Sequence, residues 1–250
     1  MSKLDVLFTP AEYDALTGRD LSVTTCVVFD VLRATSTMLT ALANGAETVI
    51  PVREIADAMA IRRQRPGVLL AGERHGLRIT AAQSGGVDFD LGNSPREFTA
   101  GRVKGRTLVM TTTNGTRALR ACAEAKLVLI GALLNLQALA DEIRARKPQR
   151  LLLVCAGTAE EAAYEDALAA GGLCDGLWNE FGADASDSAW MARRLFQQAR
   201  ADLTAALGAS RNGRRLLAIP ELAADVAACA CLDAVPLIAE LNAQGEMRAV

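Results

Sequence analysis

Carboxylates and arginines follow two apolar runs of this sequence, each at the point where the run ends. Asp30 closes the run of residues 24–30, and Arg33 lies three positions later; Glu73 and Arg74 come directly after the run of residues 68–71. A carboxylate at the end of a buried strand needs a partner, because an unpaired buried charge is costly. With only one histidine, His75, a histidine-rich metal site is excluded, and oxygen ligands indicate a hard cation, Mg²⁺.

A third apolar run, residues 107–110, is followed by a segment rich in hydroxyl groups. It reads Thr111, Thr112, Thr113, Asn114, Gly115 and Thr116, and a helical stretch comes next. Backbone N–H groups in a strand–turn–helix connection point at one spot, and the helix dipole adds positive charge there. The motif of a P-loop is absent. We expect the segment to bind phosphate or another oxyanion; the alternative is an ordinary turn.

A fourth run ends at Cys155 and leads through Thr158 into a helix expected over residues 160–170. In that helix Glu165 and Asp166 lie about two turns in, too far from its start to cap it. Only one of two adjacent acids can face the sheet, and we choose Asp166. Cys155 is a candidate nucleophile, although a cysteine that ends an apolar strand more often belongs to the core.

Asn93 and Ser94 are further candidates for binding a substrate. Ser94, Pro95 and Glu97 fit a capping box with proline at the first helical position, which accounts for Ser94 without a site. Asn93 has no such explanation. Carboxylates, arginines and an oxyanion site at one edge of a sheet together describe metal-assisted phosphoryl transfer, in which arginine stabilises the phosphoryl oxygens.

The elements that position these residues alternate along the chain. Strands are expected over residues 24–30, 48–52, 68–71, 107–110, 127–130 and 151–155, and helices over residues 34–44, 55–65, 116–125, 135–146 and 160–170, with a loop over residues 80–90 and a helical last third over residues 184–250. This alternation predicts one α/β domain over residues 1–250, with three layers (α/β/α) and a largely parallel or mixed sheet. Ligands of such sheets bind at the carboxyl ends of the strands, where all four candidate segments lie.

Composition excludes several other classes of protein. Of 250 residues, 51% are hydrophobic and 22% charged, and the formal net charge is −2. This excludes intrinsic disorder and gives no basic stripe for nucleic acid. No apolar run reaches the roughly eighteen residues of a membrane span, and the N-terminal residues lack a signal peptide. We expect a cytoplasmic protein with no membrane or nucleic-acid partner and six reduced core cysteines; a homodimer is left open.

Several of these segments resemble the 2-phosphosulfolactate phosphatases of the ComB family. They follow in order from about residue 24 to residue 172, and they read FDVLRATST, ALANGAETVIPV, AGER, DFDLGNSP, TTTNGT and VCAGT, then ED and AGG. Residues 210–213, Asp225 and residues 233–236 are similar to the tail of the family. The resemblance implies a ComB-like three-layer fold and a Mg²⁺-dependent phosphoric monoester hydrolase. Family members hydrolyse 2-phosphosulfolactate to 3-sulfolactate and phosphate in coenzyme M biosynthesis.

The resemblance also implies roles for individual residues. Asp30, Glu73 and Asp166 are the expected Mg²⁺ ligands and, with Arg33, the catalytic residues. The expected binders of phosphate and sulfonate are Arg33, Arg74, Asn93, Thr112, Thr113 and Asn114, and the further substrate-binding candidates are Ser94, Thr116 and Thr158. Residues 81–88 depart from the family pattern with a longer loop, so the substrate is open and another small phosphorylated 2-hydroxy acid is an alternative.

Two other functions compete with this interpretation. A haloacid-dehalogenase-type phosphatase forms an aspartyl-phosphate and needs a second aspartate two residues after Asp30, where Leu32 stands instead. A non-catalytic anion-binding protein would use the threonine-rich segment alone. Three converging acids argue against it, because carboxylates repel a bare anion unless a metal intervenes.

Overall fold

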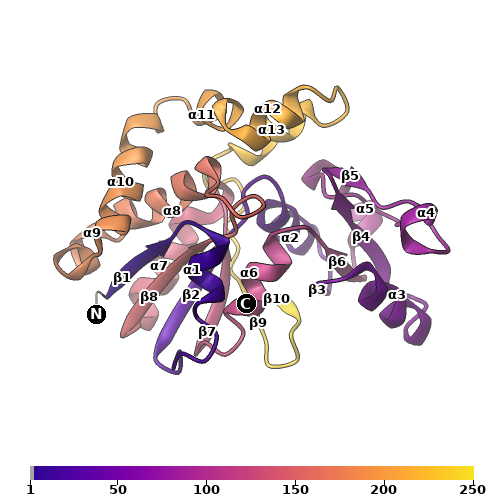
Figure 1. Ribbon diagram of the computed structural model, residues 1–250, viewed down its shortest axis with the longest axis horizontal. Coiled ribbons are helices and arrows are strands. Elements are labelled where there is room, and N and C mark those ends of the chain that lie inside the picture. Colours follow the sequence, from indigo (N-terminus) through magenta and orange to yellow (C-terminus); the bar gives the residue numbers. More distant parts are fainter. Residues whose placement is uncertain (1–2) are drawn as a thin grey trace.

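Ten strands form one mixed sheet in the computed structural model, which describes residues 3–250 (Figure 1). The strands are β1 (Leu4–Leu7), β2 (Thr24–Phe29), β3 (Thr48–Val52), β4 (Leu69–Arg74), β5 (Leu77–Arg78), β6 (Thr107–Thr111), β7 (Leu127–Gly131), β8 (Arg150–Cys155), β9 (Ala239–Leu241) and β10 (Met247–Ala249). Their order is β1-β8-β2-β7-β9-β10-β3-β6-β4-β5. The predicted α/β class with a mixed sheet is confirmed.

The sheet consists of two parallel blocks joined by an antiparallel hairpin. In one block β1, β8, β2 and β7 pair in parallel, and in the other β3, β6 and β4 do so. The hairpin of β9 and β10 lies between them and runs antiparallel to β7 on one side and to β3 on the other. Figure 1 shows this hairpin in yellow, between the two halves of the molecule.

Helices cover both faces of the sheet, which gives three layers. They are α1 (Pro10–Asp14), α2 (Ala34–Ala43), α3 (Ile55–Gln64), α4 (Ala81–Ser84), α5 (Ala100–Val103), α6 (Gly115–Ala121), α7 (Leu136–Arg146), α8 (Tyr164–Gly176), α9 (Trp178–Phe181), α10 (Asp187–Ala199), α11 (Leu203–Ala209), α12 (Arg211–Leu217) and α13 (Ala223–Cys229). Along β2, Val27 and Phe29 enter one apolar core while Cys26 and Val28 enter the other. A strand that is apolar on both faces fits a parallel sheet covered on both sides.

The predicted elements differ from the structure in several places. The last third is helical only as far as α13, and β9 and β10 were missed because three-residue strands carry too short a pattern to detect. β1, a strand of four residues, was not predicted either. Residues 80–90 contain the short helix α4 rather than a plain loop, and Glu73 and Arg74 lie within β4 rather than after it. The helix after β8 begins at Tyr164, not at residue 160.

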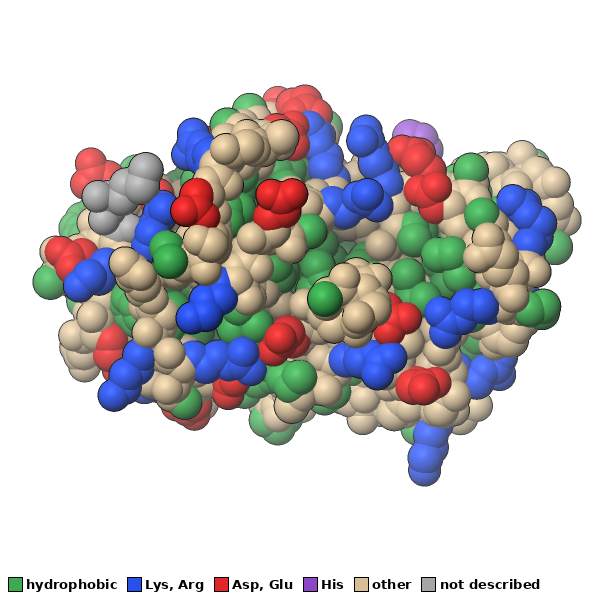
Figure 2. Space-filling view, turned by 90° about the horizontal axis from the view of Figure 1, so that it is seen from below, with side chains coloured by type: hydrophobic (Ala, Val, Ile, Leu, Met, Phe, Trp, Pro, Cys, Tyr) green, Lys and Arg blue, Asp and Glu red, His purple; other side chains and the backbone are tan. Residues whose placement is uncertain are grey.

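The surface carries both signs of charge. On the face in Figure 2, basic and acidic side chains are interspersed, in keeping with the near-neutral composition. Five of the six cysteines are buried as predicted, but Cys231 is exposed, so the expectation of a core residue is wrong there. Within residues 3–250, none of the helices combines the length and the apolar character that crossing a membrane requires.

Close contact between α8 and α10 depends on a glycine. A Cβ on Gly171 would overlap the carbonyl oxygen of Ala192 in α10. We expect Gly171→Ala to lower the free energy of unfolding by about 1–3 kcal/mol, the usual cost of overpacking. Urea denaturation followed by circular dichroism measures it. The matched control is Gly101→Ala in α5, where a Cβ meets nothing within 4 Å and the change should be neutral or stabilising. Equal effects of the two substitutions would contradict this packing.

Candidate active site

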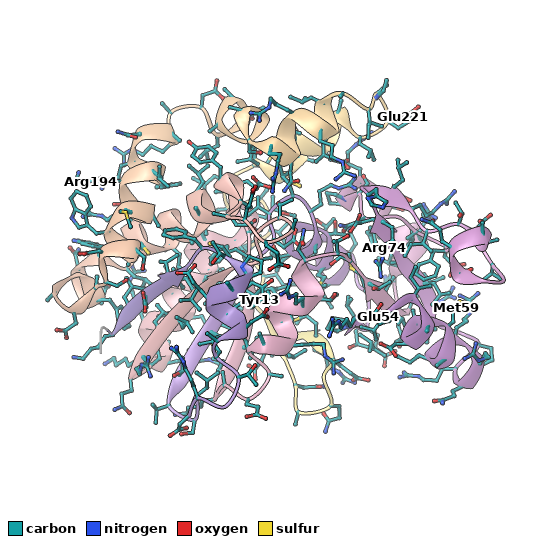
Figure 3. All side chains as sticks on the ribbon, in the orientation of Figure 1. Tyr13, Glu54, Met59, Arg74, Arg194 and Glu221 are labelled. Atoms are coloured by element: carbon teal, nitrogen blue, oxygen red, sulfur yellow. The ribbon has the colours of Figure 1, made fainter. Side chains whose placement is uncertain are left out.

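A cavity of ≈ 350 Å³ lies at the carboxyl ends of β2, β4 and β6, with α12 over it. The predicted site residues that line it are Asp30, Arg33, Glu73, Arg74, Asn93, Thr112, Thr113, Asn114 and Thr158. They come from both parallel blocks of the sheet. In Figure 3, Arg74 is labelled on the half of the molecule that carries β4, and the C-terminal helices lie above it. The position agrees with the rule that ligands of open α/β sheets bind beyond the strand ends.

Three predicted residues do not line this cavity. Thr116 faces a neighbouring cavity of ≈ 550 Å³, and its hydroxyl donates to the carbonyl of Thr112. Ser94 and Asp166 are buried beside the site and contact other groups of the protein. The divergent residues 81–88 do not line the cavity either; they fold around α4 near α3.

Asp30 is a buried carboxylate held by backbone N–H groups. Its Oδ1 accepts a hydrogen bond of 3.1 Å from the N–H of Ala34, at the start of α2. Gly115 approaches it so closely that a Cβ there would lie 2.6 Å from Oδ2, which explains the need for glycine. Burial raises the pKa of Asp30 to about 7, and the charges of Glu73 and Glu165 act in the same direction.

Glu73 is held by the turn between β6 and α6. Its Oε1 accepts hydrogen bonds of 2.9 Å from both the N–H and the hydroxyl of Thr113, and its Oε2 accepts one of 2.7 Å from Gly76 N–H. The threonine-rich turn was expected to point its N–H groups at an oxyanion of the substrate. In the structure the Thr113 N–H instead holds a carboxylate of the chain itself. The turn thus positions acids as well as lining the cavity.

Glu165 and Asp166 both face inward, so the expectation that only one of them does is wrong. Because α8 begins at Tyr164, both lie in its first turn, with exposed fractions of 1% and 2%. Asp166 accepts hydrogen bonds from the N–H groups of Val31 (2.8 Å) and Gly157 (3.1 Å). Burial and then the charge of Glu165 raise the pKa of Asp166. Asp166 ties the loops after β2 and β8 together.

Arg33 pairs with an acid that the sequence did not single out for a role. Its Nη1 lies 2.6 Å from Oδ2 of Asp225 in α13, and both side chains are buried. The other oxygen of Asp225 accepts a 2.7 Å hydrogen bond from the Ser94 hydroxyl. Ser94 stands at the N-cap of the short 3-10 helix Pro95–Glu97 with proline first, as expected, but its side chain makes no capping hydrogen bond. Capping therefore does not account for its hydroxyl. The tail segment of the family resemblance contains Asp225 and was the available signal.

Asn212 on α12 is a second residue of the site to which the sequence analysis gave no role. Its Nδ2 donates hydrogen bonds of 2.6 Å to both the hydroxyl of Thr158 and Oε1 of Glu165. One amide therefore joins α12, the loop after β8 and the first turn of α8. Asn212 itself lines the cavity.

Two buried polar atoms of the cavity wall have no partner among the described residues. They are Oδ1 of Asn93 and the hydroxyl of Thr112, on residues that are 5% and 3% exposed. Buried polar atoms are nearly always hydrogen-bonded, so each such atom needs an explanation. Their place in the wall indicates that a ligand or water supplies the missing partner.

The carboxylates of the cavity wall suit a hard cation such as Mg²⁺, but fewer than three of them can bind it directly. Asp30 and Glu73 line the cavity with oxygen donors, which Mg²⁺ prefers. Within residues 3–250, however, no three His, Cys, Asp or Glu side chains are grouped so that they could hold a metal ion. Mg²⁺ commonly uses one or two carboxylates and completes its shell with water and substrate phosphate. Asp166, with both oxygens on backbone N–H groups, is the least suited of the three expected ligands.

Cys155 lies in the core rather than in the cavity wall. It is fully buried in the apolar core on one face of the sheet. Burial, and then the charge of Asp166, raise the pKa of its thiol well above the usual range. A thiol without thiolate character is a poor nucleophile.

The fold and the cavity define an α/β protein whose ligand site is acidic, arginine-lined and located at the strand ends. The sequence profile of a family described as 2-phosphosulpholactate phosphatase matches residues 11–244. The chain belongs to the 2-phosphosulfolactate phosphatase family.

Relatives in several bacteria agree with this assignment. A protein of Caldanaerobacter subterraneus subsp. tengcongensis is 43% identical over 173 residues, which are 68% of each chain. One of Synechococcus sp. (strain RCC307) is 37% identical over 229 residues, covering 89% of this chain and 91% of its own. One of Carboxydothermus hydrogenoformans is 35% identical over 243 residues, covering 97% and 94%. Each is named a probable 2-phosphosulfolactate phosphatase.

The buried pair of Arg33 and Asp225 leads to a prediction about stability. Removing one partner of a buried pair leaves the other charge uncompensated, so we expect Asp225→Asn to lower the free energy of unfolding by about 3–5 kcal/mol. Urea denaturation measures it. The control is Asp184→Asn, because Asp184 pairs with Lys3 at the surface, where the side chains are 55% and 59% exposed; its loss should cost less than about 1 kcal/mol. If the two variants were equally stable, the pair would not stabilise the fold.

Proposed function

We propose that this chain is a Mg²⁺-dependent phosphatase that hydrolyses the phosphate monoester of 2-phosphosulfolactate to 3-sulfolactate and phosphate. The observation that carries the proposal is one cavity at the strand ends that combines buried carboxylates, arginines and two unpaired polar atoms. The family and the names of its members support the choice of substrate. Residues 81–88, which we expect to differ from the family pattern, do not line the cavity. Their difference therefore gives no reason to expect another substrate.

Asp30 and Glu73 are the residues proposed to hold the cation. Both line the cavity, and both are fixed by backbone N–H groups, so their oxygens are positioned before any ligand arrives. Burial together with neighbouring acids disfavours the charged form of Asp30, and a bound cation would relieve that repulsion. When bound, Mg²⁺ would neutralise phosphate charge and help to position the attacking water.

The arginines and the unpaired polar atoms are proposed to bind the phosphoryl group. Arg33 keeps its guanidinium in the cavity wall through hydrogen bonds to Asp225 and to the carbonyl of Gly76. Arg74 is held by the carbonyl of Glu73 and the hydroxyl of Thr111. Guanidinium groups fixed in this way stabilise charge on phosphoryl oxygens without reorganising during the reaction. The Thr112 hydroxyl gains a hydrogen-bond partner when an oxygen of the substrate enters.

Direct attack by water is favoured over a covalent phosphoenzyme. Asp30 packs its carboxylate against the backbone of Ala34 and Gly115, which restricts the approach of a phosphorus atom. Cys155 lies outside the cavity wall and its thiol has a raised pKa. We also propose that the reaction belongs to coenzyme M biosynthesis and takes place in the cytoplasm, and membership of the family supports the choice of pathway.

A phosphate-release assay tests this function. The substrates are 2-phosphosulfolactate, phospholactate, phosphoglycolate and phosphoglycerate, each with Mg²⁺. We expect the highest kcat/KM for 2-phosphosulfolactate, complete loss of turnover with EDTA and recovery when Mg²⁺ is added back. If phosphate were released from none of the four substrates, the proposed phosphatase activity would be wrong. Undiminished turnover in EDTA would overturn the metal requirement alone.

Substitution of Asp30 tests the central carboxylate. Asp30→Asn keeps the size of the side chain and removes its charge, and we expect kcat to fall at least about a hundredfold, as when a key electrostatic group is lost. The control is Asp88→Asn, an exposed aspartate outside the cavity wall, which should leave kcat unchanged. Circular dichroism confirms that both variants fold. Near-wild-type activity of Asp30→Asn would remove Asp30 from the reaction.

A further inference from the structure

Helix α12 turns one face toward the cavity. Four residues of this segment line it, namely Asn212, Arg215, Leu216 and, just past the end of the helix, Ile219. Their spacing of three, four and seven residues is that of a single helix face. The other arginines of the helix are engaged elsewhere, since Arg211 pairs with Glu161 and Arg214 donates to the carbonyl of Ala209.

The position of this face is fixed from two directions. Asn212 joins the helix to Thr158 and Glu165, as described above. At the start of the helix, the hydroxyl of Ser210 accepts a hydrogen bond of 2.9 Å from the N–H of Gly213. Arg215 lies one turn after Asn212 on the same face. Its backbone is therefore held in a defined place over the cavity.

Arg215 lines the cavity and is exposed, and its side chain makes no ion pair or hydrogen bond with residues 3–250. Its guanidinium lies over the turn between β4 and β5, where a Cβ on Gly76 would be 3.7 Å from Nη2. The same Gly76 donates to Glu73 and accepts from Arg33. The unpaired guanidinium of Arg215 therefore lies next to Gly76, which is hydrogen-bonded to both Glu73 and Arg33.

The other arginines of the wall are already held by the protein. Arg33 is neutralised by Asp225, and Arg74 donates to two carbonyl groups and the Thr111 hydroxyl. The five N–H donors of Arg215 remain available to a ligand, in a geometry that matches a carboxylate or a sulfonate. Leu216 and Ile219 place apolar surface beside it, where a short carbon chain can pack.

We propose that Arg215 binds an acidic group that the substrate carries in addition to its phosphate, and thereby selects phosphorylated acids over simple phosphomonoesters. This inference rests on the proposed function, because it assigns one end of the substrate of that same cavity. The phosphate faces the carboxylate and strand-end side of the cavity, and the second acid faces α12. Arg215 is a specificity-determining residue in this arrangement.

Two measurements on Arg215→Gln test the proposal. With Mg²⁺, we expect KM for 2-phosphosulfolactate to rise about tenfold or more, the effect of losing a charged hydrogen-bond partner. The kcat should stay within about threefold, and KM for p-nitrophenyl phosphate, which has no second acid, should not change. Arg215→Lys should recover part of the loss because it keeps the charge. The matched control is Arg214→Gln on the same helix, which should behave as wild type.

The second measurement does not depend on turnover. Isothermal titration of 3-sulfolactate, which carries a carboxylate and a sulfonate but no phosphate, should show binding to wild type and at least tenfold weaker binding to Arg215→Gln. Equal binding to both, or no binding to wild type, would overturn the inference. So would an equal rise of KM for both phosphomonoesters. If 3-sulfolactate binds through Arg215 but no phosphate is released from any substrate, the role of Arg215 in binding an acid is supported and the proposed phosphatase activity is wrong.

Discussion

The site depends on keeping several carboxylates close together in a buried place. Asp30, Glu73, Glu165 and Asp166 are each no more than 8% exposed, and their charges repel one another. Such a group persists only when hydrogen-bond donors satisfy its oxygens. Here the donors are mostly backbone N–H groups at the ends of strands and the starts of helices, with the amide of Asn212 added. The loops are therefore shaped by the acids that they hold.

This arrangement explains which parts of the site were predictable from sequence. Asp30, Glu73 and the turn at Thr112 and Thr113 lie at or just past the carboxyl ends of strands, and the topology of a parallel sheet brings strand ends to one edge. The pattern was strong there because the strands are apolar and continuous. Sequence could not say that the N–H of Thr113 faces Glu73 rather than a ligand, because that depends on how close β4 and β6 lie.

The wrong predictions for Ser94, Glu165 and the C-terminal strands each involve contacts between residues far apart in the chain. Ser94 fits a capping box locally, yet its hydroxyl pairs with Asp225, 131 residues away. Glu165 was assigned outward because the start of α8 was misplaced, and its carboxylate accepts a hydrogen bond from Asn212, 47 residues away. The partners of β9 and β10 in the sheet likewise lie far off in the chain. Local patterns report local structure, and these contacts are set by the tertiary fold.

The C-terminal segment has a larger part in the site than its helical pattern indicated. The cavity combines Asp30 from one parallel block with Glu73 from the other, so the site exists only if the two blocks are held in register. The hairpin of β9 and β10 joins them within the sheet. Beyond the strand ends, Asp225 in α13 holds Arg33, which in turn donates to the carbonyl of Gly76 next to β4. The segment from α12 to β10, which covers the cavity, therefore also joins its two walls. This couples the geometry of the acids to the docking of the C-terminal helices.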